Sequence, residues 1–424
     1  MTMESTRTKP RSIHYGYIVL FSSVLVALGS NGFGRFAYPV ILPAMKQGLG
    51  LTYEQTGWLA SWNFIGYLAL SVIGGVLASR FGPRAVITVG LILLGITLIG
   101  TGFAPDFSTA LLMRTLSGIG NGGSFVPVMA LSAAWFAASK RGLASGFITG
   151  GIGLGLVISG MLLPGIIVGN GSDGWRYAWY FIGAIVILVG LISLVLLRNR
   201  PGEMGLVPIG GSPEPKAPSA STSVTSTSGL LASAQTIYAK VVFWQLSFAY
   251  FLFGLSYVIY STYFVAYLVK EGSLTEAAAG GLWAIAGAIS IISGSIWGIV
   301  SDVWGRKYGL AIVFFLQTVS YFMFAALPNM YGFYISAILF GLTAWSIPAI
   351  MAAACGDYAG SKLAPAALGS VTFFYGIGQA IGPYIGGRIA DATGSFVLAF
   401  FLAAATAALG IVASLALRPP RTNC

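Results

Sequence analysis

The sequence predicts an all-α integral membrane protein in which twelve transmembrane helices form two six-helix bundles. Three observations favour this fold class: an apolar composition, apolar runs long enough to span a bilayer, and a repeat of the first half in the second. Of the 424 residues, 56% are hydrophobic and only 8% are charged, whereas about a quarter of the residues of a soluble domain are charged. A surface so poor in charge cannot face water on every side, so we expect the lipid bilayer to be its main solvent.

The apolar runs are long enough to cross a bilayer, which takes roughly 20 helical residues. They are apolar on all sides, unlike the amphipathic helices of a soluble bundle, and the alternating strands of a membrane barrel are absent from the sequence. The first six runs fall at about 17–43, 55–78, 84–103, 108–136, 142–168 and 176–197. The second six fall at about 241–268, 276–300, 308–327, 331–354, 365–388 and 395–417.

These runs divide the chain into five parts. We expect a tail at 1–16, a bundle at 17–197, a linker at 198–240, a second bundle at 241–417 and a tail at 418–424. The linker is expected to be flexible because it is rich in Ser, Thr and Pro. Most of the 22 Lys and Arg residues fall on the side of the two tails, so the positive-inside rule places both termini in the cytoplasm. The net charge of +11 is therefore read as a topology signal, and no nucleic-acid partner is expected.

A shift of 223 residues superposes the two halves. Glycines recur at this shift, and so does a basic residue: Gly57 and Gly280, Gly75 and Gly298, Gly82 and Gly305, Gly118 and Gly341, and Arg84 and Lys307. Because each half has the same number of spans, the repeat is parallel and its axis lies along the membrane normal. Two bundles arranged in this way leave a cleft between them, where we expect a binding site near the middle of the membrane.

Two loops and two helices carry motifs of a known superfamily. The loops GGVLASRFGPR (74–84) and GIVSDVWGRK (298–307) resemble the loop motif G-x-L-A-D-R-x-G-R-K of the major facilitator superfamily, the MFS. RTLSGIGNGG (114–123) and GIGQAIGPYIGG (376–387) resemble two of its glycine-rich helix motifs, although close helix packing is the other explanation of such glycines. The resemblance implies gating roles for Ser79, Arg80, Arg84, Asp302, Arg306 and Lys307. Ser79 departs from the motif, which has an acid where Asp302 stands in the second half.

Two further strings resemble smaller branches of the superfamily. GFGRFAYPVILP (32–43) is similar to the YbfB/YjiJ-type bacterial branch, and RPGEMGLVP (200–208) is similar to bacterial monocarboxylate and oxalate carriers. The resemblance implies a monomeric secondary transporter of the bacterial inner membrane that moves a small molecule by alternating access. We expect no enzyme activity, cofactor or metal, because no phosphate loop, nucleophile–base pair or metal-ligand spacing occurs.

Away from the ends of the predicted spans, Arg35 and Arg114 are the only charged residues. Such residues are costly in a membrane and are functional candidates by default. The acids lie at or beyond the span ends, as Glu276 does, and leave the two arginines without a partner inside the spans. Arg binds carboxylates in a bidentate manner. We therefore predict that both arginines bind an anionic substrate. Bonds to backbone carbonyls, extension toward the membrane surface, or pairing with Asp106 are the alternatives.

Other polar side chains follow helical spacing and mark faces suited to line a cavity. The remaining candidate substrate-binding residues are Asn31, Tyr38, Asn121, Tyr257, Tyr260, Tyr375 and Gln379. Interhelical hydrogen bonds are the alternative for the amides, since buried amides need partners. We predict proton-coupled transport of a small organic anion. The alternative, suggested by the tyrosines of 241–268, is efflux of hydrophobic or drug-like compounds, and the repeat disfavours a receptor that transports nothing.

Overall fold

The computed structural model describes residues 14–211, 237–360 and 363–417, and these residues are mainly helical. The first half contains α1 (Gly16–Ala27), η1 (Leu28–Phe33), α2 (Tyr38–Leu49), α3 (Tyr53–Phe81), α4 (Pro83–Gly102), α5 (Phe107–Trp135), α6 (Ala138–Gly169), η2 (Gly171–Asp173), α7 (Gly174–Leu196) and η3 (Pro201–Met204). The second half contains α9 (Val241–Lys270), α10 (Glu276–Trp304), α11 (Arg306–Ala326), α12 (Met330–Thr343), α13 (Ser346–Ala359), α14 (Ala364–Thr393) and α15 (Val397–Leu415).

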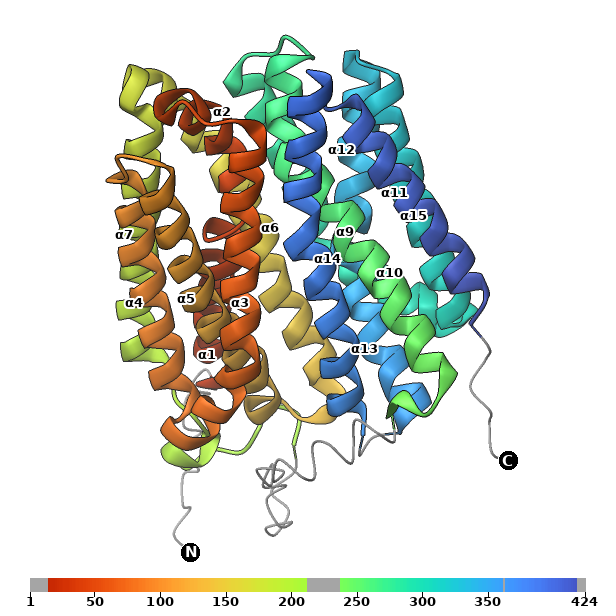
Figure 1. The fold of residues 1–424 in the computed structure, drawn as a ribbon. Helices are drawn as coiled ribbons and strands as arrows, with labels where there is room; N and C mark the ends of the chain where they lie inside the picture. Colours follow the sequence, from red (N-terminus) through yellow and green to blue (C-terminus); the bar gives the residue numbers. More distant parts are fainter. Residues whose placement is uncertain (1–13, 212–236, 361–362, 418–424) are drawn as a thin grey trace, which may run out of the picture.

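The helix boundaries repeat the shift found in the sequence. The starts of α3, α4, α5 and α7 recur 223 residues later as the starts of α10, α11, α12 and α15. Figure 1 shows the long helices running between two ends of the molecule, with α1 beginning and α15 ending at the same end. We call this end the Arg84 end, after the residue that follows the α3–α4 connection, and the opposite end the Asp391 end.

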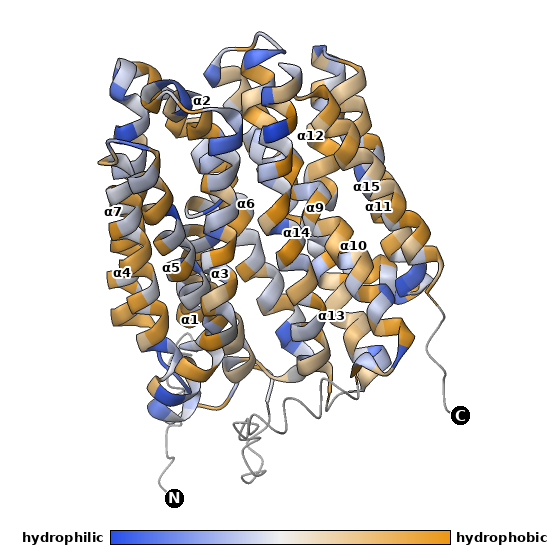
Figure 2. Ribbon diagram, in the orientation of Figure 1, coloured by the Kyte–Doolittle hydropathy of each residue, from blue (hydrophilic) through white to orange (hydrophobic). Residues whose placement is uncertain are grey.

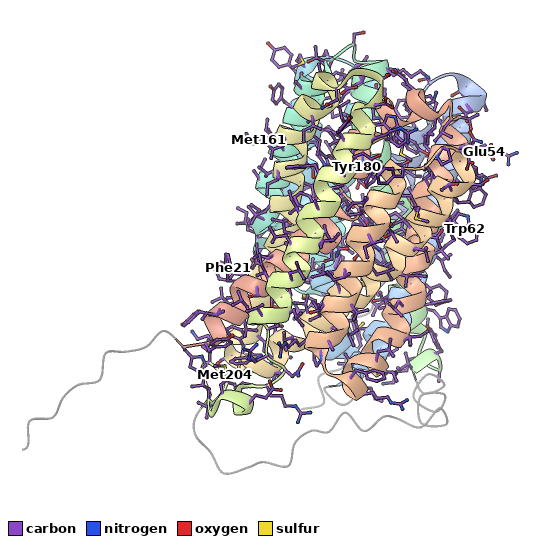
Figure 3. All side chains as sticks on the ribbon, turned by 90° about the vertical axis from the view of Figure 1, so that its left-hand side faces the viewer. Phe21, Glu54, Trp62, Met161, Tyr180 and Met204 are labelled. Atoms are coloured by element: carbon purple, nitrogen blue, oxygen red, sulfur yellow. The ribbon has the colours of Figure 1, made fainter. Side chains whose placement is uncertain are left out.

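The surface between the two ends is apolar. Hydrophobic residues cover much of the sides of the bundle, whereas the hydrophilic residues gather mostly at its two ends (Figure 2). Large side chains such as Phe21 and Met161, which are 60% and 68% exposed, project from these sides (Figure 3). Exposed apolar area on this scale is typical of a surface that contacts lipid or another protein, which agrees with the predicted membrane class.

The number of apolar helices is lower than the sequence-based count of twelve spans. Nine helical segments of the described residues are long and apolar enough to cross a membrane, or ten if the bent helix α3 is included. The two long helices outside this set are α5 and α14, with 29 and 30 residues. Both are rich in Gly, and Ser, Asn or Gln lower their hydropathy further. Their composition suits helices that pack mainly against other helices.

Tight turns at the Arg84 end explain two motif glycines. Gly82 joins α3 to α4 with a φ of 83°, and Gly305 joins α10 to α11 with a φ of 91°. Only glycine adopts such a backbone conformation without strain. Gly118 has a different role: a Cβ there would lie 2.0 Å from the Asn63 carbonyl oxygen of α3. The packing explanation therefore holds for this helix-motif glycine.

The structure differs from the expectation of a flexible linker at its first residues. His14 hydrogen-bonds the Val207 carbonyl oxygen at 3.1 Å, and Ile209 pairs with the backbone around Phe136. Residues 198–211 therefore pack against the first half. The rest of the linker up to residue 236 lies outside the described residues, as do 1–13 and 418–424 of the two tails.

Candidate functional site

The first span, predicted as one helix over 17–43, is one helical segment over Gly16–Leu49, but its geometry is irregular around Arg35. It changes from α1 to the π-helix η1 at Leu28, continues as turns over 34–37 and becomes α2 at Tyr38. Glycines within 28–34 weaken the helix, and Pro39 has no N–H to donate to the carbonyl of Arg35. Such π-segments often occur at functional sites. Arg35 lies in this irregular part, near the middle of the span.

Arg35 lies against aromatic rings and keeps free donors. Its guanidinium carbon is 4.0 Å from the ring centroid of Tyr67 and 4.4 Å from that of Phe64, both on α3. The residue is 9% exposed, and its Nε and Nη2 have no hydrogen-bond partner among the described residues. These two nitrogens form one edge of the guanidinium, the edge that pairs with the two oxygens of a carboxylate.

Arg114 on α5 is almost completely buried, at 1% exposure. Its Nη1 donates to the Gly34 carbonyl oxygen at 3.1 Å, so the alternative of a bond to a backbone carbonyl holds for this nitrogen. Its Nε has no partner among the described residues. The ring of Tyr38 lies 4.9 Å from its guanidinium carbon. Asp106 is not its partner, because the Asp106 carboxylate caps α5 and accepts from the Thr109 N–H at 2.8 Å. This backbone hydrogen bond lowers the pKa of the Asp106 carboxyl.

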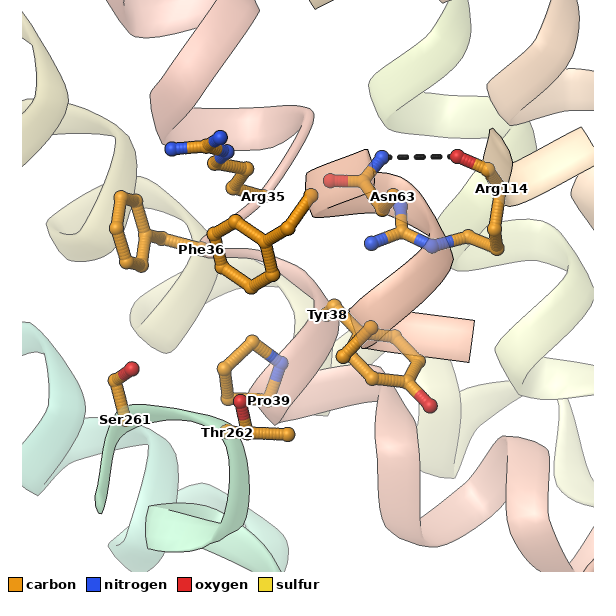
Figure 4. A pocket seen from close by; sticks show the side chains of 10 residues that line it. Arg35, Phe36, Tyr38, Pro39, Asn63, Arg114, Ser261 and Thr262 are labelled. Carbon is orange, nitrogen blue, oxygen red and sulfur yellow. Dashed lines mark hydrogen bonds between the residues drawn. The ribbon is translucent and has the colours of Figure 1, made fainter. Parts of the chain in front are cut away.

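Both arginines line one small cavity between the two halves (Figure 4). Ser261 and Thr262 of α9 line it from the second half. Its volume is about 10 Å³, comparable to the space that one water molecule needs. Asn63 also lines it, and its amide donates to the Arg114 carbonyl oxygen and to Ser117 at 3.0 and 2.8 Å. Any substrate larger than water therefore requires this cavity to widen.

Three of the predicted residues form a second polar group, on α9 and α14. The Tyr257 hydroxyl accepts hydrogen bonds from the Tyr375 hydroxyl, at 3.2 Å, and from the Gln379 amide. The rings of Tyr257 and Tyr375 are nearly parallel, with 13° between their planes. Ser261, one helical turn after Tyr257 on α9, lines the cavity with Arg35, so this group lies beside the cavity on the same face of α9.

The structure does not bring every predicted residue to this place. Tyr260 lies inside the second half, where its hydroxyl contacts Ser336 at 2.6 Å and its ring packs against other aromatic rings. Asn31 and Asn121 are buried, and each lies within seven residues of an arginine in the sequence, but neither lines the cavity. Tyr67 was missed, although it follows Asn63 by one helical turn, and that spacing was the available signal.

The residues with predicted gating roles are bonded differently in the two halves. Arg306 pairs with Asp302 and, at 2.7 Å, with Asp357. In the first half Arg84 instead donates to the Leu194 carbonyl oxygen at the end of α7, at 2.9 Å from its Nε. Among the described residues the remaining three have local contacts: Ser79 donates to the Val76 carbonyl oxygen, and Arg80 and Lys307 lie near the rings of Phe81 and Tyr308. The 223-residue shift maps Asp302 to Ser79 and Arg306 to Pro83, so the first half lacks both members of this ion pair.

The two halves are joined at the Asp391 end. The Asp391 carboxylate of α14 accepts from the backbone N–H groups of Tyr53 and Glu54, at 3.0 and 2.7 Å, where α3 begins. The Tyr263 hydroxyl donates to the Tyr53 carbonyl oxygen at 3.3 Å. Nearer the cavity, the Trp283 indole donates to the Phe36 carbonyl oxygen at 3.0 Å. Helix α3 packs along α14, and α6 packs along α10.

Contact between the halves is looser toward the Arg84 end. A Cβ on Gly146 of α6 would lie 3.1 Å from Ser295 Oγ of α10, but one on Gly142, a turn further, would meet nothing within 4 Å. On α14, Gly376 lies against Leu68 of α3, whereas Gly369 has open space. The structure is therefore a conformation closed at the Asp391 end.

A repeated bundle of membrane-length helices, with buried cations at a cavity between its halves, defines a secondary transporter of the MFS type. The chain belongs to the family described as "Uncharacterised MFS-type transporter YbfB", which it matches over residues 24–415. This confirms the superfamily and the first of the two branches predicted from the motifs. The family is one of multi-pass membrane transporters and not of enzymes.

Some known proteins resemble the chain over most of its length, and others over about half of it. It is 25% identical over 404 residues to the probable sulfoacetate transporter SauU of Cupriavidus necator, with 91% of this chain and 90% of that protein covered. It is 28% identical over 209 residues to a probable hexose phosphate transport protein of Chlamydia pneumoniae, with 49% of this chain and 45% of that protein covered. A bacterial homolog of the human lysosomal transporter Spinster, inward-facing and occupied, superposes with a TM-score of 0.75 at 16% identity over 96% of both chains. At that identity the likeness concerns the fold alone.

Proposed function

We propose that this protein transports a small organic anion by alternating access and that Arg35 and Arg114 bind the anionic group. The observation that carries the proposal is the free edge of Arg35, where Nε and Nη2 lack partners in a buried position. A buried donor without an acceptor costs about 1–3 kcal/mol, and more when it is charged. A carboxylate or another oxyanion removes this cost by accepting from both nitrogens.

The charges around the cavity support an anion over a neutral or cationic substrate. Arg35 and Arg114 are the only buried charged side chains among the described residues, and they repel one another electrostatically. No ion pair of the described residues involves either of them. An anion between the two guanidinium groups replaces this repulsion by two attractions in a medium of low dielectric constant.

The named relatives support the same class of substrate. Sulfoacetate and hexose phosphate, which appear in the names of two relatives, are both organic oxyanions. Their acidic groups differ, which fits recognition by arginine because the guanidinium pairs with planar or tetrahedral oxyanions alike.

The drug-efflux alternative loses part of the feature that suggested it. Of the tyrosines on α9, Tyr260 and Tyr267 pack inside the second half against Phe324 and Phe400. They stabilise that half and offer no surface to a ligand at the cavity. Tyr257 remains beside the site, but a neutral apolar ligand leaves the free donors of Arg35 unsatisfied, so we propose the anion.

The transport cycle that we propose follows from the repeat. The bundles 17–197 and 241–417 rock about the site, and the positive-inside rule places the Arg84 end in the cytoplasm. The conformation described above is then closed to the outside. No carboxylate of the described residues lines the cavity, so we propose that a coupling proton travels on the substrate.

Uptake into proteoliposomes tests this function. The wild-type protein should accumulate radiolabelled sulfoacetate or another member of a panel of small carboxylates and sulfonates, driven by an inward proton gradient. Arg35→Gln and Arg114→Gln should each lower the transport efficiency by roughly 30-fold or more, since a charge-assisted hydrogen bond contributes about 2 kcal/mol.

A matched control is Arg388→Gln, because Arg388 is exposed and bonds Tyr384 one turn away on α14. This variant should transport at the wild-type rate. Unchanged anion uptake in both cavity variants, or uptake of neutral compounds alone by the wild-type protein, would contradict the proposal.

A further inference from the structure

The hydroxyl of Tyr257 has a donor that the protein leaves unused. A phenol hydroxyl can donate once and accept through its lone pairs. Tyr375 and Gln379 both donate to this oxygen. Among the described residues no acceptor is found for the Tyr257 hydrogen, although the side chain is only 1% exposed. Tyr257 is therefore a buried donor whose direction is set by two neighbours.

The position of this donor connects it to the anion site of the first half. Ser261, one helical turn after Tyr257 on α9, lines the cavity together with Arg35. The Nε and Nη2 of Arg35 have no partner among the described residues. Unused donors from both halves thus lie at the same cavity, and an acceptor with several lone pairs satisfies them together.

Aromatic stacking holds Tyr257 in place before any substrate binds. Its ring is stacked on Phe253 at 4.8 Å, and Tyr375 is stacked on Tyr250 at 4.4 Å, with interplanar angles of 16° and 12°. A side chain fixed in this way loses little conformational entropy when a ligand binds, so its hydrogen bond contributes more to affinity.

We propose that the Tyr257 hydroxyl donates to the same oxyanion that Arg35 binds, and that Gln379 and Tyr375 are positioning residues that keep its hydrogen directed at the substrate. The inference rests on the proposed function and adds the specificity of the site: the substrate carries an oxyanion that accepts from both halves at once. A bound anion then links the halves, whereas a ligand that contacts Arg35 alone does not.

Direct binding tests this role. Purified wild-type protein and variants are compared for the dissociation constant of the best-binding anion from a panel of sulfoacetate, acetate, glycolate and methanesulfonate. Tyr257→Phe keeps the ring stack and removes only the donor, so affinity should fall about 10- to 100-fold, as expected for a hydrogen bond to a charged group. The matched control is Tyr267→Phe, on the same helix, whose hydroxyl is buried without a partner; its affinity should be unchanged.

The positioning role has its own readout. In Gln379→Glu the new carboxylate accepts the Tyr257 hydrogen, so affinity relative to wild type should fall at neutral pH and recover as acid protonates the carboxyl. Repulsion between the carboxylate and the anion also recovers in acid, so the same substitution is made in Tyr257→Phe. An equal recovery in both backgrounds contradicts the positioning role, which predicts a larger recovery when the Tyr257 hydroxyl is present. Melting temperatures show whether each variant is folded. In Tyr257→Phe the Gln379 amide loses its acceptor, so a double variant, Tyr257→Phe with Gln379→Leu, removes this unpaired donor as well.

The outcomes separate the two proposals. If Arg35→Gln loses anion binding while folded Tyr257→Phe and the double variant bind like wild type, the Tyr257 inference is wrong and the anion function stands. If no panel anion binds the wild-type protein, or if Arg35→Gln binds like wild type, the proposed function itself fails. Loss of binding in both Arg35→Gln and Tyr257→Phe, with Tyr267→Phe unaffected, supports both.

Discussion

The contact between Asp391 and the start of α3 should control how tightly one end of the transporter closes. The two carboxylate oxygens accept from two backbone N–H groups of the other half, at Tyr53 and Glu54. Asp391→Asn keeps one acceptor oxygen, turns an NH₂ group toward the second N–H, and removes the negative charge from a helix N-terminus. Because Asp391 is exposed, the loss is discounted for solvent screening to about 1–2 kcal/mol, which shifts the closed-to-open ratio roughly 5- to 30-fold.

Distances between spin labels at this end measure the shift. Ser108 on α5 and Tyr331 on α12 belong to different halves, lie at the Asp391 end and are exposed. After both native cysteines are replaced, labels at these positions should show a larger population of long distances in Asp391→Asn than in the unsubstituted protein.

The control makes the same chemical change without touching the contact between the halves. Asp173 lies at the same end and pairs with Arg176 of its own half at 3.2 Å. Asp173→Asn should leave the distance distribution unchanged. Equal distributions in Asp391→Asn and the unsubstituted protein would refute the reasoning, and so would an equal broadening in both variants.

Three further substitutions have expected outcomes that thermal unfolding or transport assays can check. Gly82→Ala should lower the stability by about 1–2 kcal/mol, because its φ of 83° strains any side chain, whereas Gly75→Ala, with open space around it, should be neutral or stabilising. Arg306→Gln should cost only about 0.5–1 kcal/mol, since its acidic partners are 62% and 40% exposed. Trp283→Phe removes the donor to the Phe36 carbonyl oxygen; it should weaken closure by about 1 kcal/mol and slow transport several-fold.

The fold was predictable because the features that indicate it are local in the sequence. Spans of apolar residues and the 223-residue repeat depend on composition and order alone, and the helix starts at Tyr53 and Glu276 reproduce that shift. The π-helical segment before Arg35 was not predicted. The sequence around it contains glycines and Pro39, but α5 contains glycines and Pro127 and stays α-helical. Such residues therefore do not by themselves show where a helix becomes irregular.

The site was predictable where a charge stands in an apolar run and much less so elsewhere. Arg35 and Arg114 are visible in the sequence because nothing else is charged away from the ends of the spans, and the structure brings them to one cavity. The tyrosines of α9 could not be sorted in this way. That helix is buried on nearly all sides, so helical spacing cannot tell the face toward the other half, with Tyr257, from the face with Tyr260.

The repeat also explains why only one side of the closed end has a carboxylate bonded to a helix start. The shift that relates the halves maps Tyr53 to Glu276 and Val168 to Asp391. The α3–α14 side therefore has a carboxylate against a helix start, while the α6–α10 side has a valine. On that second side a cavity of about 250 Å³ lies among Val168, Ser172, Glu276 and their neighbours, and Glu276 Oε2 has no partner.

Because these carboxylate hydrogen bonds lie on one side of the Asp391 end, their removal should change the spacing of the two helix pairs unequally. Asp391→Asn should increase the spacing between α3 and α14, where the lost hydrogen bonds lie, more than the spacing between α6 and α10, which never had them. Spin labels on the two helix pairs measure both spacings in one variant. Equal changes on the two sides would mean that the halves part as rigid bodies about a central axis and that Asp391 acts on the whole end. A change confined to α3 and α14 would mean that this side opens as a separate unit, which a symmetric repeat alone does not predict.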